Sequence, residues 1–516
     1  MGQLAGSDTA VTLPDVSAAD VTLDPRVPAR GRFNGAVSMP SRVGEKLGRH
    51  TKIVATLGPA TDAPGVLDAL VAAGLDCARL NCSHGTADDL SRRASEVRAA
   101  AARAGRPLGV LFDLQGPKLR LASDTPERGL RPGEVIVLTD GERLGAMDCV
   151  VVDYRGFSRI VTERSEVVVG DGMPRLAVES TTNGHVFARV LSAGRIGPSK
   201  GVSVTFARPE LPAITEKDTA DLELAARAGA DFVALSFVRC GADVDDLRRR
   251  LRAHGSAASI VAKIETVEAY ENLDEILATA DGVMIARGDY GVTAGLARVP
   301  LMQKDVTARA TRAGKFVITA TQMLESMISA PEPTRAEVAD VANAVIDGTS
   351  AVMLSAETGV GQHPVQAVRA MSAIAEAAEE SPDLREHARR GDVEAGTPAA
   401  AVMHAAVQLA DELDAAAIIV PTATGGSARA CAKHRPSSPI VALAHDRLVA
   451  EQLMLEWGVY PVVAELARSL DELLEVALGV ARDFAGLGSG DRFVLTGGQQ
   501  PGSSGATNVV MAQTLR

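Results

Sequence analysis

The chain has 516 residues, of which 46% are apolar and only 3% are aromatic. This length is too great for one core and predicts two to four domains with mainly aliphatic interiors. The 53 Lys and Arg residues against 65 Asp and Glu residues give a formal net charge of -12, which argues against nucleic acid or an anionic membrane surface as a partner.

The cysteines and the amino-terminal region indicate where the chain works. The five cysteines are scattered and form no CxxC pair, so we expect neither a disulfide framework nor a zinc site, and a cytoplasmic protein is favoured. No apolar run is long enough to span a bilayer. Residues 1–47 are rich in Ala, Asp, Val, Pro and Ser without a sustained period, and we expect them to form a disordered tail.

From Thr51 onward, short apolar runs alternate with helix-like stretches. Eight such runs begin at Thr51, Leu75, Leu108, Asp231, Ser259, Asp281, Lys315 and Ser350. Eight buried strands alternating with helices predict an α/β fold, a (β/α)8 TIM barrel over residues 48–113 and 207–378. A doubly wound open sheet is the alternative, but the count of eight favours the barrel.

Further alternating runs interrupt and follow the barrel. Those within residues 114–206 predict a small β domain inserted after the third barrel strand. Because that loop lies at the carboxyl face, where barrel active sites form, a lid is favoured over a passive decoration. A polar linker over residues 379–397 leads to residues 398–516, where strands and helices alternate again and predict a second, smaller α/β domain.

Charged and polar side chains gather where the predicted barrel strands end. Alternation along a strand places Arg79, Asn81 and Ser83 on one face of the second strand and Lys263 with Glu265 on one face of the fifth. The other strand-end residues are Asp113, Asp289, Thr321, Ser355 and Glu357. Any one ion pair could be structural, but their convergence at one rim indicates a divalent metal with a phosphorylated, carboxylated substrate.

The residue types at this rim suit phosphoryl transfer. Mg2+, or Mn2+ in its place, prefers a few carboxylate oxygens, for which Glu265 and Asp289 are the best candidates. Phosphoryl transfer requires cations on the equatorial oxygens, a role open to Lys263 and Arg79. The chain contains neither a GxxxxGK[ST] loop nor a Ser-His-Asp order, which disfavours a Walker-type nucleotide cradle and nucleophilic hydrolysis.

Several of these segments are similar to the motifs of pyruvate kinases, and the resemblance extends from Thr51 to the end of the chain. The motifs that carry it are TKIVATLGPAT, ARLNCSHG, DLQGPKLR, MIARGDYGV, ATQMLESMI and VMLSAET. The resemblance implies phosphoryl transfer from phosphoenolpyruvate to ADP, giving pyruvate and ATP, the final step of glycolysis. It also implies a β-barrel lid domain after barrel strand 3, a C-terminal α/β regulatory domain, and a homotetramer.

By position, the resemblance assigns roles to individual residues. Arg79 would contact the transferring phosphoryl group, Lys263 would stabilise it in flight, and Glu265 with Asp289 would hold the divalent ion. Gly288 and Thr321 would contact the carboxylate end of the substrate, with Thr321 near the enolate that must be protonated. The residues facing the nucleotide phosphates would be Asn81, Ser83, His84 and Arg120, joined on lid closure by Lys200.

One departure from the family concerns the monovalent cation. Potassium-dependent members read DTKGPE where this chain reads DLQGPK, with Leu114 for Thr and Lys118 for Glu. An ammonium group resembles a potassium ion in charge and size, so Lys118 is expected to act as an internal cation and K+ not to be required. The monovalent-cation region would comprise Asn81, Ser83, Asp113, Leu114 and Lys118. Softer departures are Tyr290, Thr293 and Ala356.

A second candidate site lies in the C-terminal domain. The loop TATGGS, with Thr422, Thr424, Gly425, Gly426 and Ser427, follows a predicted strand and precedes a helix, where free N–H groups attract phosphate. We expect a phosphorylated allosteric effector there, facing the loop 501–508. The alternative is an ordinary strand-to-helix turn. Gly426 replaces a basic residue of the family, which weakens the case for a sugar bisphosphate.

Two other functions fit some of the same residues. A magnesium-dependent aldolase or lyase acting on a pyruvate enolate would also use paired carboxylates, but it leaves the lid and Lys200 without a role. A non-catalytic sensor of phosphorylated metabolites would not need the full set of Lys263, Glu265, Asp289 and Thr321.

Overall fold

A computed structural model describes residues 47–141, 149–170, 172–205, 211–381, 397–465, 467–498 and 507–516, all of which fall in one compact unit. The predicted tail, apart from Leu47, most of the linker and residues 501–506 of the loop facing the TATGGS segment lie outside the described residues.

Eight parallel strands close into a barrel, which confirms the predicted strands. They are β1 (Lys52–Thr56), β2 (Cys77–Asn81), β3 (Gly109–Asp113), β13 (Phe232–Leu235), β14 (Ser259–Ile264), β15 (Gly282–Ala286), β16 (Phe316–Ala320) and β17 (Ala351–Leu354). Their order around the barrel is β1-β17-β16-β15-β14-β13-β3-β2. Register places Thr56 beside Arg79 and Asn81 beside Asp113, so the polar ends of neighbouring strands meet at one rim.

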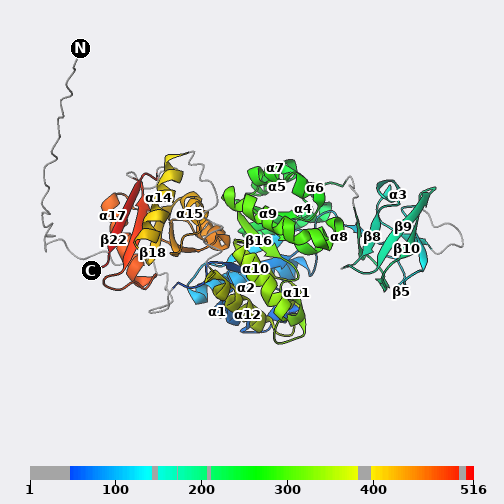
Figure 1. Ribbon diagram of the computed structural model, residues 1–516, viewed down its shortest axis with the longest axis horizontal. Helices are drawn as coiled ribbons and strands as arrows, with labels where there is room; N and C mark the ends of the chain where they lie inside the picture. The colour runs from blue at the N-terminus through cyan, green and yellow to red at the C-terminus, as the bar shows by residue number, and fades with distance from the viewer. Residues whose placement is uncertain are drawn as a thin grey trace, which may run out of the picture. The chain divides into compact units, whose positions relative to one another are not determined.

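Helices pack around the barrel strands (Figure 1). They are α1 (Val66–Ala72), α2 (Ala87–Ala104), α4 (Glu216–Arg227), α5 (Gly241–Ala253), α6 (Val267–Glu271), α7 (Leu273–Thr279), α8 (Arg287–Ala294), α9 (Val299–Arg312), α10 (Arg335–Ile346), α11 (Ala356–Gly359) and α12 (Pro364–Glu379). A threonine caps the start of α2, α4 and α10, each in a capping box with an acid three residues later, which satisfies otherwise unpaired helix N–H groups.

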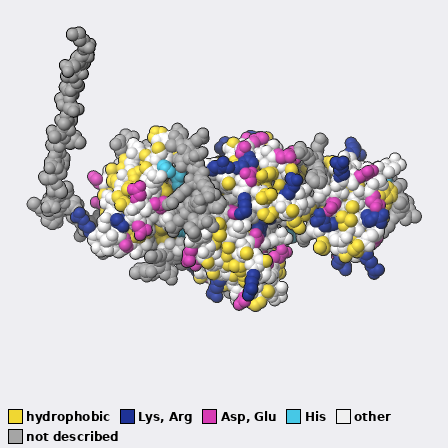
Figure 2. Space-filling model, viewed as in Figure 1, with side chains coloured by type: hydrophobic (Ala, Val, Ile, Leu, Met, Phe, Trp, Pro, Cys, Tyr) yellow, Lys and Arg dark blue, Asp and Glu magenta, His cyan; other side chains and the backbone are white. Residues whose placement is uncertain are grey.

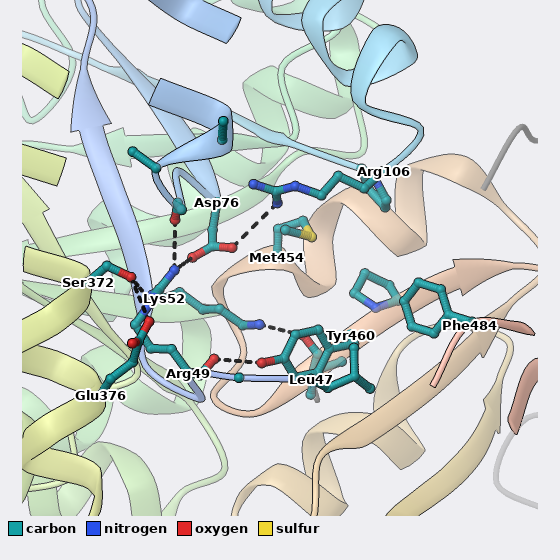
Figure 3. Close-up of a pocket in the computed structure, with 17 residues that line it drawn as sticks. Leu47, Arg49, Lys52, Asp76, Arg106, Ser372, Glu376, Met454, Tyr460 and Phe484 are labelled. Atoms are coloured by element: carbon teal, nitrogen blue, oxygen red, sulfur yellow. Dashed lines mark hydrogen bonds and ion pairs between the residues drawn. The ribbon is translucent and has the colours of Figure 1, made fainter. Parts of the chain in front are cut away.

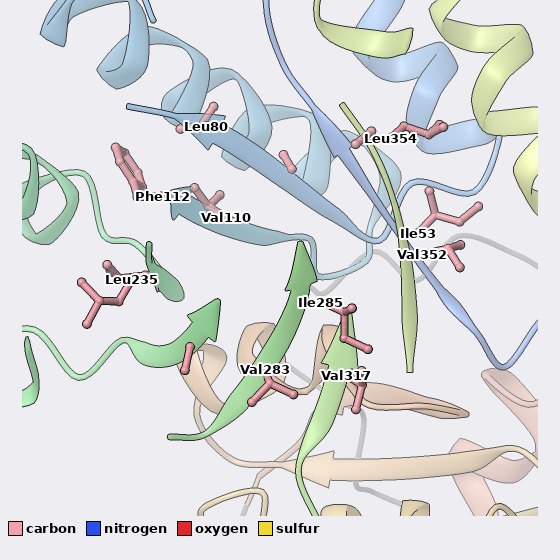
Figure 4. Close-up of a cluster of buried hydrophobic side chains, with 14 of the residues drawn as sticks. Ile53, Leu80, Val110, Phe112, Leu235, Val283, Ile285, Val317, Val352 and Leu354 are labelled. Carbon is pink, nitrogen blue, oxygen red and sulfur yellow. The ribbon is translucent and has the colours of Figure 1, made fainter. Parts of the chain in front are cut away.

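The barrel has an outer and an inner apolar layer, because strand side chains alternate in direction. Ile53, Leu80, Phe112, Val283 and Val317 belong to the outer layer between strands and helices (Figure 4). The inner layer fills the barrel axis and contains Val54, Leu111, Met284 and an edge-to-face pair of Phe232 and Phe316. The interior is therefore a packed core, and a ligand can bind only at its rim.

The inserted segment forms the predicted β domain. Its seven-stranded sheet has the order β4-β12-β8-β9-β10-β6-β7. The strands are β4 (Leu119–Arg120), β6 (Val135–Thr139), β7 (Cys149–Val151), β8 (Glu166–Val169), β9 (Arg175–Thr182), β10 (His185–Val190) and β12 (Gly201–Val204), with β5 (Arg128–Leu130) and β11 (Gly194–Ile196) as a separate pair and the short helix α3 (Phe157–Ile160). A bridge between Leu121 and Val152 joins the two edges, so the sheet curls into a barrel.

The C-terminal domain is a five-stranded sheet of order β20-β19-β18-β21-β22. Its strands are β18 (Ala417–Thr422), β19 (Ile440–Ala444), β20 (Val459–Val463), β21 (Arg492–Gly497) and β22 (Val509–Thr514), with helices α14 (Pro398–Glu412), α15 (Gly426–Ala432), α16 (Arg447–Gln452) and α17 (Leu470–Asp483). Only β22 is antiparallel among them. Leu455 of this domain is fully buried in the inner layer of the barrel.

The surface carries charges of both signs. Lys and Arg side chains are interspersed with Asp and Glu on the face shown in Figure 2. In the described part of the chain, every helix is too short or too polar to cross a membrane.

Candidate active site

A cavity of about 270 Å³ lies at the carboxyl ends of the barrel strands and includes glycines of the inserted domain. It brings together eleven of the predicted residues: Arg79, Asn81, Ser83, His84, Asp113, Leu114, Lys118, Arg120, Lys263, Glu265 and Asp289. These residues come from β2, β3, β14, α8 and the start of the inserted domain. The structure therefore brings these residues together at one rim, as their positions at the strand ends predict.

A buried network ties the two predicted phosphoryl-binding cations to one carboxylate. The Nε of Arg79 donates to Asp113 at 2.7 Å and its Nη1 to the hydroxyl of Thr56 at 2.9 Å. The Nζ of Lys263 lies 3.2 Å from the other oxygen of Asp113 and 3.1 Å from Glu265. Among the described residues, nothing bonds to Nη2 of Arg79, so this nitrogen is available to a ligand.

The carboxylates keep Lys263 charged. Burial by itself would lower the pKa of this lysine, but Asp113 and Glu265 outweigh burial and raise its pKa well above the ordinary value. Burial would likewise raise the pKa of Asp113, yet Lys263 and Arg79 hold it below the usual range. Lys263 is therefore a permanent cation at neutral pH, suited to stabilising negative charge and unsuited to releasing a proton.

Glu265 and Asp289 form the predicted metal pair. Burial raises the pKa of Glu265, and the neighbouring charge of Asp289 raises it further against the opposing effect of Lys263. One oxygen of Glu265 accepts from the N–H of Phe237 at 2.6 Å. A buried carboxylate whose pKa is raised by a neighbouring carboxylate marks a place where a divalent cation is favourable.

The donor set fits Mg2+ in particular. In the described part of the chain, no group of three or more His, Cys, Asp and Glu side chains gathers as a metal cage. Mg2+ usually takes one or two carboxylates and completes its shell with substrate oxygens and water. Glu265 and Asp289, the two carboxylates predicted to bind the metal, match that number.

Lys118 forms an ion pair with Asp289, one of the two carboxylates that are predicted to bind the metal. Its Nζ lies 3.1 Å from Asp289, whereas Asp113, which was expected to face the monovalent cation, pairs with Arg79 and Lys263. The stem of Lys118 passes over Gly201 of the inserted domain, where an added Cβ would lie 2.8 Å from its Cε. The cation therefore sits in the same cavity as the predicted cation region, but beside Asp289.

Thr321 and Gly288 lie side by side. The N–H of Gly288 donates to the Thr321 hydroxyl at 3.0 Å, and that hydroxyl donates to the carbonyl of Ala320 at 2.7 Å. Thr321 has a φ of 65°, in the left-handed region that β-branched residues rarely adopt. Strained backbone of this kind is common where a side chain must be aimed at a substrate.

Three of the predicted site residues, Gly288, Thr321 and Lys200, do not line the cavity. Lys200, which is predicted to reach the nucleotide only when the lid closes, donates to the carbonyl of Arg195 at 2.8 Å. Glu357, noted at the end of the eighth strand, is buried and accepts from the N–H groups of Leu324 and Ser355, so its role here is to hold loops. In the TATGGS segment, Ser427 lies 3.1 Å from Thr507.

Sequence reasoning missed five residues of the cavity wall, Gln115, Gly170, Gly201, Ser236 and Phe237, of which Ser236 and Phe237 bond directly to the charged residues. Ser236 accepts a hydrogen bond from Lys263 at 2.7 Å and donates to the carbonyl of Leu114 at 2.7 Å, which anchors the lysine to the third-strand motif. Phe237, with a φ of 54°, presents the N–H that binds Glu265. Alternation beyond the end of β13 would have placed Ser236 on the inner face.

Two of the softer departures from the family, Thr293 and Tyr290, make contacts that hold α8, the helix that carries Asp289. The Thr293 hydroxyl donates to the backbone carbonyl of Glu265 at 3.2 Å, which links α8 to the end of β14. The Tyr290 ring is 3% exposed and packs edge-to-face on Tyr270. Both contacts fix the helix that carries Asp289.

A larger cavity, of about 520 Å³, lies at the opposite strand ends, between the barrel and β20 (Figure 3). None of the predicted catalytic residues lines it. Its wall contains Lys52, whose Nζ donates to the carbonyl of Val459 at 2.6 Å and lies 4.3 Å from the centre of the Tyr460 ring. Burial lowers the pKa of Lys52 to about 8. Cavity size therefore does not identify the active site, whereas strand polarity and residue chemistry do.

The fold and the rim cavity define a TIM-barrel protein whose cations and paired carboxylates suit a phosphorylated anion and a divalent metal. Residues 48–368 match the family model "Pyruvate kinase, barrel domain", and residues 400–512 match "Pyruvate kinase, alpha/beta domain". This chain belongs to the pyruvate kinase family.

Individual relatives support the same assignment. The chain is 40% identical over 474 residues to a pyruvate kinase of Geobacillus stearothermophilus, covering 90% of this chain and 80% of the relative. It is also 40% identical over 470 residues to a pyruvate kinase of Methylorubrum extorquens, covering 90% and 97%. A pyruvate kinase of Clostridium acetobutylicum is 35% identical over 470 residues, covering 90% and 99%.

Proposed function

We propose that this chain transfers the phosphoryl group of phosphoenolpyruvate to ADP, giving pyruvate and ATP. The observation that carries the proposal is the convergence of Arg79, Lys263, Glu265 and Asp289 in one cavity at the carboxyl face of the barrel, in a chain of the pyruvate kinase family. The lyase and sensor alternatives are not favoured by that membership.

The cations perform the electrostatic part of the reaction. Lys263 remains protonated and neutralises charge that develops on the equatorial oxygens of the transferring group. Arg79, held by Asp113 and Thr56, directs its remaining nitrogen to the same group. Ser236 keeps the Lys263 amine in place through a hydrogen bond.

Glu265 and Asp289 would hold Mg2+, with Mn2+ as a substitute. When bound, a divalent ion neutralises phosphate charge and orients the substrate. The Thr321 hydroxyl, fixed between the Gly288 N–H and the Ala320 carbonyl, holds its proton at Oγ1 beside the carboxylate end of the substrate.

Lys118 takes the place of potassium in this proposal. Its ammonium group lies 3.1 Å from Asp289, so a positive charge is already present in the cavity and added K+ is not required. Asn81, Ser83, His84 and Arg120 serve the nucleotide phosphates, and Lys200 joins them only after its bond to Arg195 breaks. That exchange corresponds to closure of the inserted domain over the rim.

Four further features of the proposal rest on family membership. The chain acts in glycolysis, in the cytoplasm, as a homotetramer, and it binds a phosphorylated effector near the TATGGS segment. The orphaned, buried hydroxyl of Thr422 and the left-handed Gly425, with a φ of 83°, favour an effector loop over an ordinary turn.

A coupled assay tests the reaction. Purified protein with phosphoenolpyruvate, ADP and Mg2+ should form pyruvate and ATP, and Lys263→Met should reduce the rate by roughly a hundredfold or more. Lys304→Met, at an exposed position of α9, is the matched control and should leave the rate unchanged. Binding of phosphoenolpyruvate without turnover by the wild type would favour the sensor, and cleavage of a 2-oxo acid would favour the lyase.

A further inference from the structure

The turn that carries Thr321 is held in an unfavourable conformation. Thr321 and Gln322 follow β16 directly and have φ values of 65° and 56°. Two successive L-residues in the left-handed region are rare, and a β-branched one is the least suited to it. Something in the surrounding structure must therefore hold this turn against its own preference.

The guanidinium of Arg287 grips the turn. Its Nε donates to the carbonyls of Ala320 at 3.2 Å and Thr321 at 3.1 Å. Its Nη2 donates to Thr321 at 2.6 Å and Gln322 at 3.1 Å. One planar cation therefore gathers three consecutive carbonyl oxygens, a task for which its fixed fork of donors is suited and a lysine amine is not.

Arg287 is itself locked in place. The side chain is buried, and its Nη1 donates to Asp340 of α10 at 2.7 Å and to Gln303 of α9 at 3.3 Å. Asp340 bonds to the Nη1 side of the guanidinium, and in the described part of the chain it makes no hydrogen bond to the Thr321–Gln322 turn. The grip on the carbonyls and the anchor on Asp340 can therefore be tested separately.

Both hydrogen bonds of the Thr321 hydroxyl, the one it donates and the one it accepts, involve groups that the position of Arg287 fixes. Its proton points to the carbonyl of Ala320, which Arg287 holds. Its oxygen accepts from the N–H of Gly288, the residue that follows Arg287 in α8. The next residue is Asp289, so one short segment positions the hydroxyl and a predicted metal ligand together.

We propose that Arg287 is a positioning residue for the protonation of the enolate, which it serves by holding the Thr321–Gln322 turn so that the Thr321 hydroxyl faces the substrate. The inference rests on the proposed function. Protonation forms a C–H bond at C3 of the enolate of pyruvate and breaks an O–H bond of a water molecule beside the Thr321 hydroxyl. The enolate becomes the ketone of pyruvate, and the hydroxide that remains takes a proton from the solvent.

The test separates protonation from binding. The protonation step is measured by the exchange of the pyruvate methyl protons with D2O, which NMR follows in the presence of Mg2+ and ATP. The steady-state assay gives kcat and KM. Arg287→Lys should slow exchange and kcat by about 100-fold, the effect of a displacement of about 1 Å, with KM for phosphoenolpyruvate within about threefold. Asp340→Asn keeps an oxygen that can accept from Nη1 of Arg287 and leaves the contacts with the turn in place, so it should slow exchange less than Arg287→Lys does.

A second variant tests the backbone strain of the Thr321–Gln322 turn directly, and it distinguishes a displaced turn from a misfolded protein. Glycine adopts the left-handed region without penalty, so Gln322→Gly should make the turn less dependent on the guanidinium. The double variant Arg287→Lys with Gln322→Gly should recover exchange by about tenfold over Arg287→Lys alone, at an unchanged circular dichroism spectrum.

Two results would overturn the inference. One is exchange in folded Arg287→Lys that stays close to wild type, and the other is no recovery in the double variant. A wild-type protein that forms no pyruvate from phosphoenolpyruvate and ADP would instead refute the proposed function, before any variant is compared.

Discussion

Replacing Lys118 by glutamate should create a potassium requirement. The Nζ of Lys118 lies 3.1 Å from Asp289, with the two side chains 24% and 32% exposed. At an effective dielectric of about 20 this contact corresponds to about 5 kcal/mol, and contact with water reduces it to about half. Glutamate would remove this attraction and add a further carboxylate to a cavity that already holds Glu265 and Asp289.

The expected result is a conditional loss of activity. In a potassium-free buffer with tetramethylammonium as the counterion and saturating Mg2+, a loss of roughly 3 kcal/mol corresponds to about a 100-fold lower kcat/KM for Lys118→Glu. Added K+ should restore most of it, because a bound monovalent cation again neutralises the carboxylates. The wild type should show less than about a twofold response to K+.

Lys118→Gln is the matched control, since it removes the charge without adding a carboxylate. Its activity should fall less than that of the glutamate variant and respond weakly to K+. The reasoning is refuted if the wild type is inactive without K+, or if K+ fails to activate Lys118→Glu while the variant still binds phosphoenolpyruvate.

Three further predictions concern stability and metal binding. Burial lowers the pKa of Lys52 to about 8, so between about pH 8 and pH 10.5 the unfolded chain binds more protons than the folded protein. The free energy of unfolding of the wild type should therefore rise across that window by up to about 3 kcal/mol. Urea unfolding of Lys52→Met should lack this rise, and an equal rise in both proteins would contradict the prediction. Leu455→Ala should lower the free energy of unfolding by about 2–5 kcal/mol, because the side chain is fully buried in the barrel interior. Thermal unfolding, monitored by the fluorescence of Trp457, the single tryptophan of the chain, should show a lower midpoint. An unchanged midpoint would argue against this packing. Mn2+ should bind several-fold more tightly with phosphoenolpyruvate present than alone in a calorimetric titration, and equal affinities would show that the paired cations do not compete with the metal.

Strand patterns made the architecture predictable. Each of the eight barrel strands is a short apolar run flanked by turn residues, and burial on both faces gives such runs an unambiguous signal. The short strands β4, β5, β11 and β12 were not predicted, because each is only two to four residues long and contains Arg or Gly, so no continuous apolar run marks it as a strand.

Site residues were predictable where alternation along one strand decides them. Arg79 with Asn81 and Lys263 with Glu265 follow from a spacing of two and line one cavity. Contacts between distant segments were not predictable: the pairing of Lys118 with Asp289 spans 171 residues, and the grip of Arg287 on the turn after β16 spans about one strand-helix unit. Glu357 shows the opposite case, in which a position at a strand end suggested a role in chemistry. Its carboxylate instead binds the backbone N–H groups of Leu324 and Ser355, so a carboxylate at a strand end need not take part in chemistry.

The arrangement of charges explains why a chain with a net charge of -12 can bind trianionic substrates. In the cavity, Asp113 pairs with Arg79 and Lys263, Glu265 with Lys263, and Asp289 with Lys118. Three cations thus pair with three carboxylates, and Arg120, which also lines the cavity, adds a fourth positive charge, so the lining itself carries a small net positive charge. A divalent ion alone would have to displace lysines from the carboxylates, and a phosphate alone would have to draw the same lysines away from them. Each ligand therefore removes the competitor of the other, so metal and substrate should bind together far more favourably than separately, and the bulk charge of the protein has little influence on either.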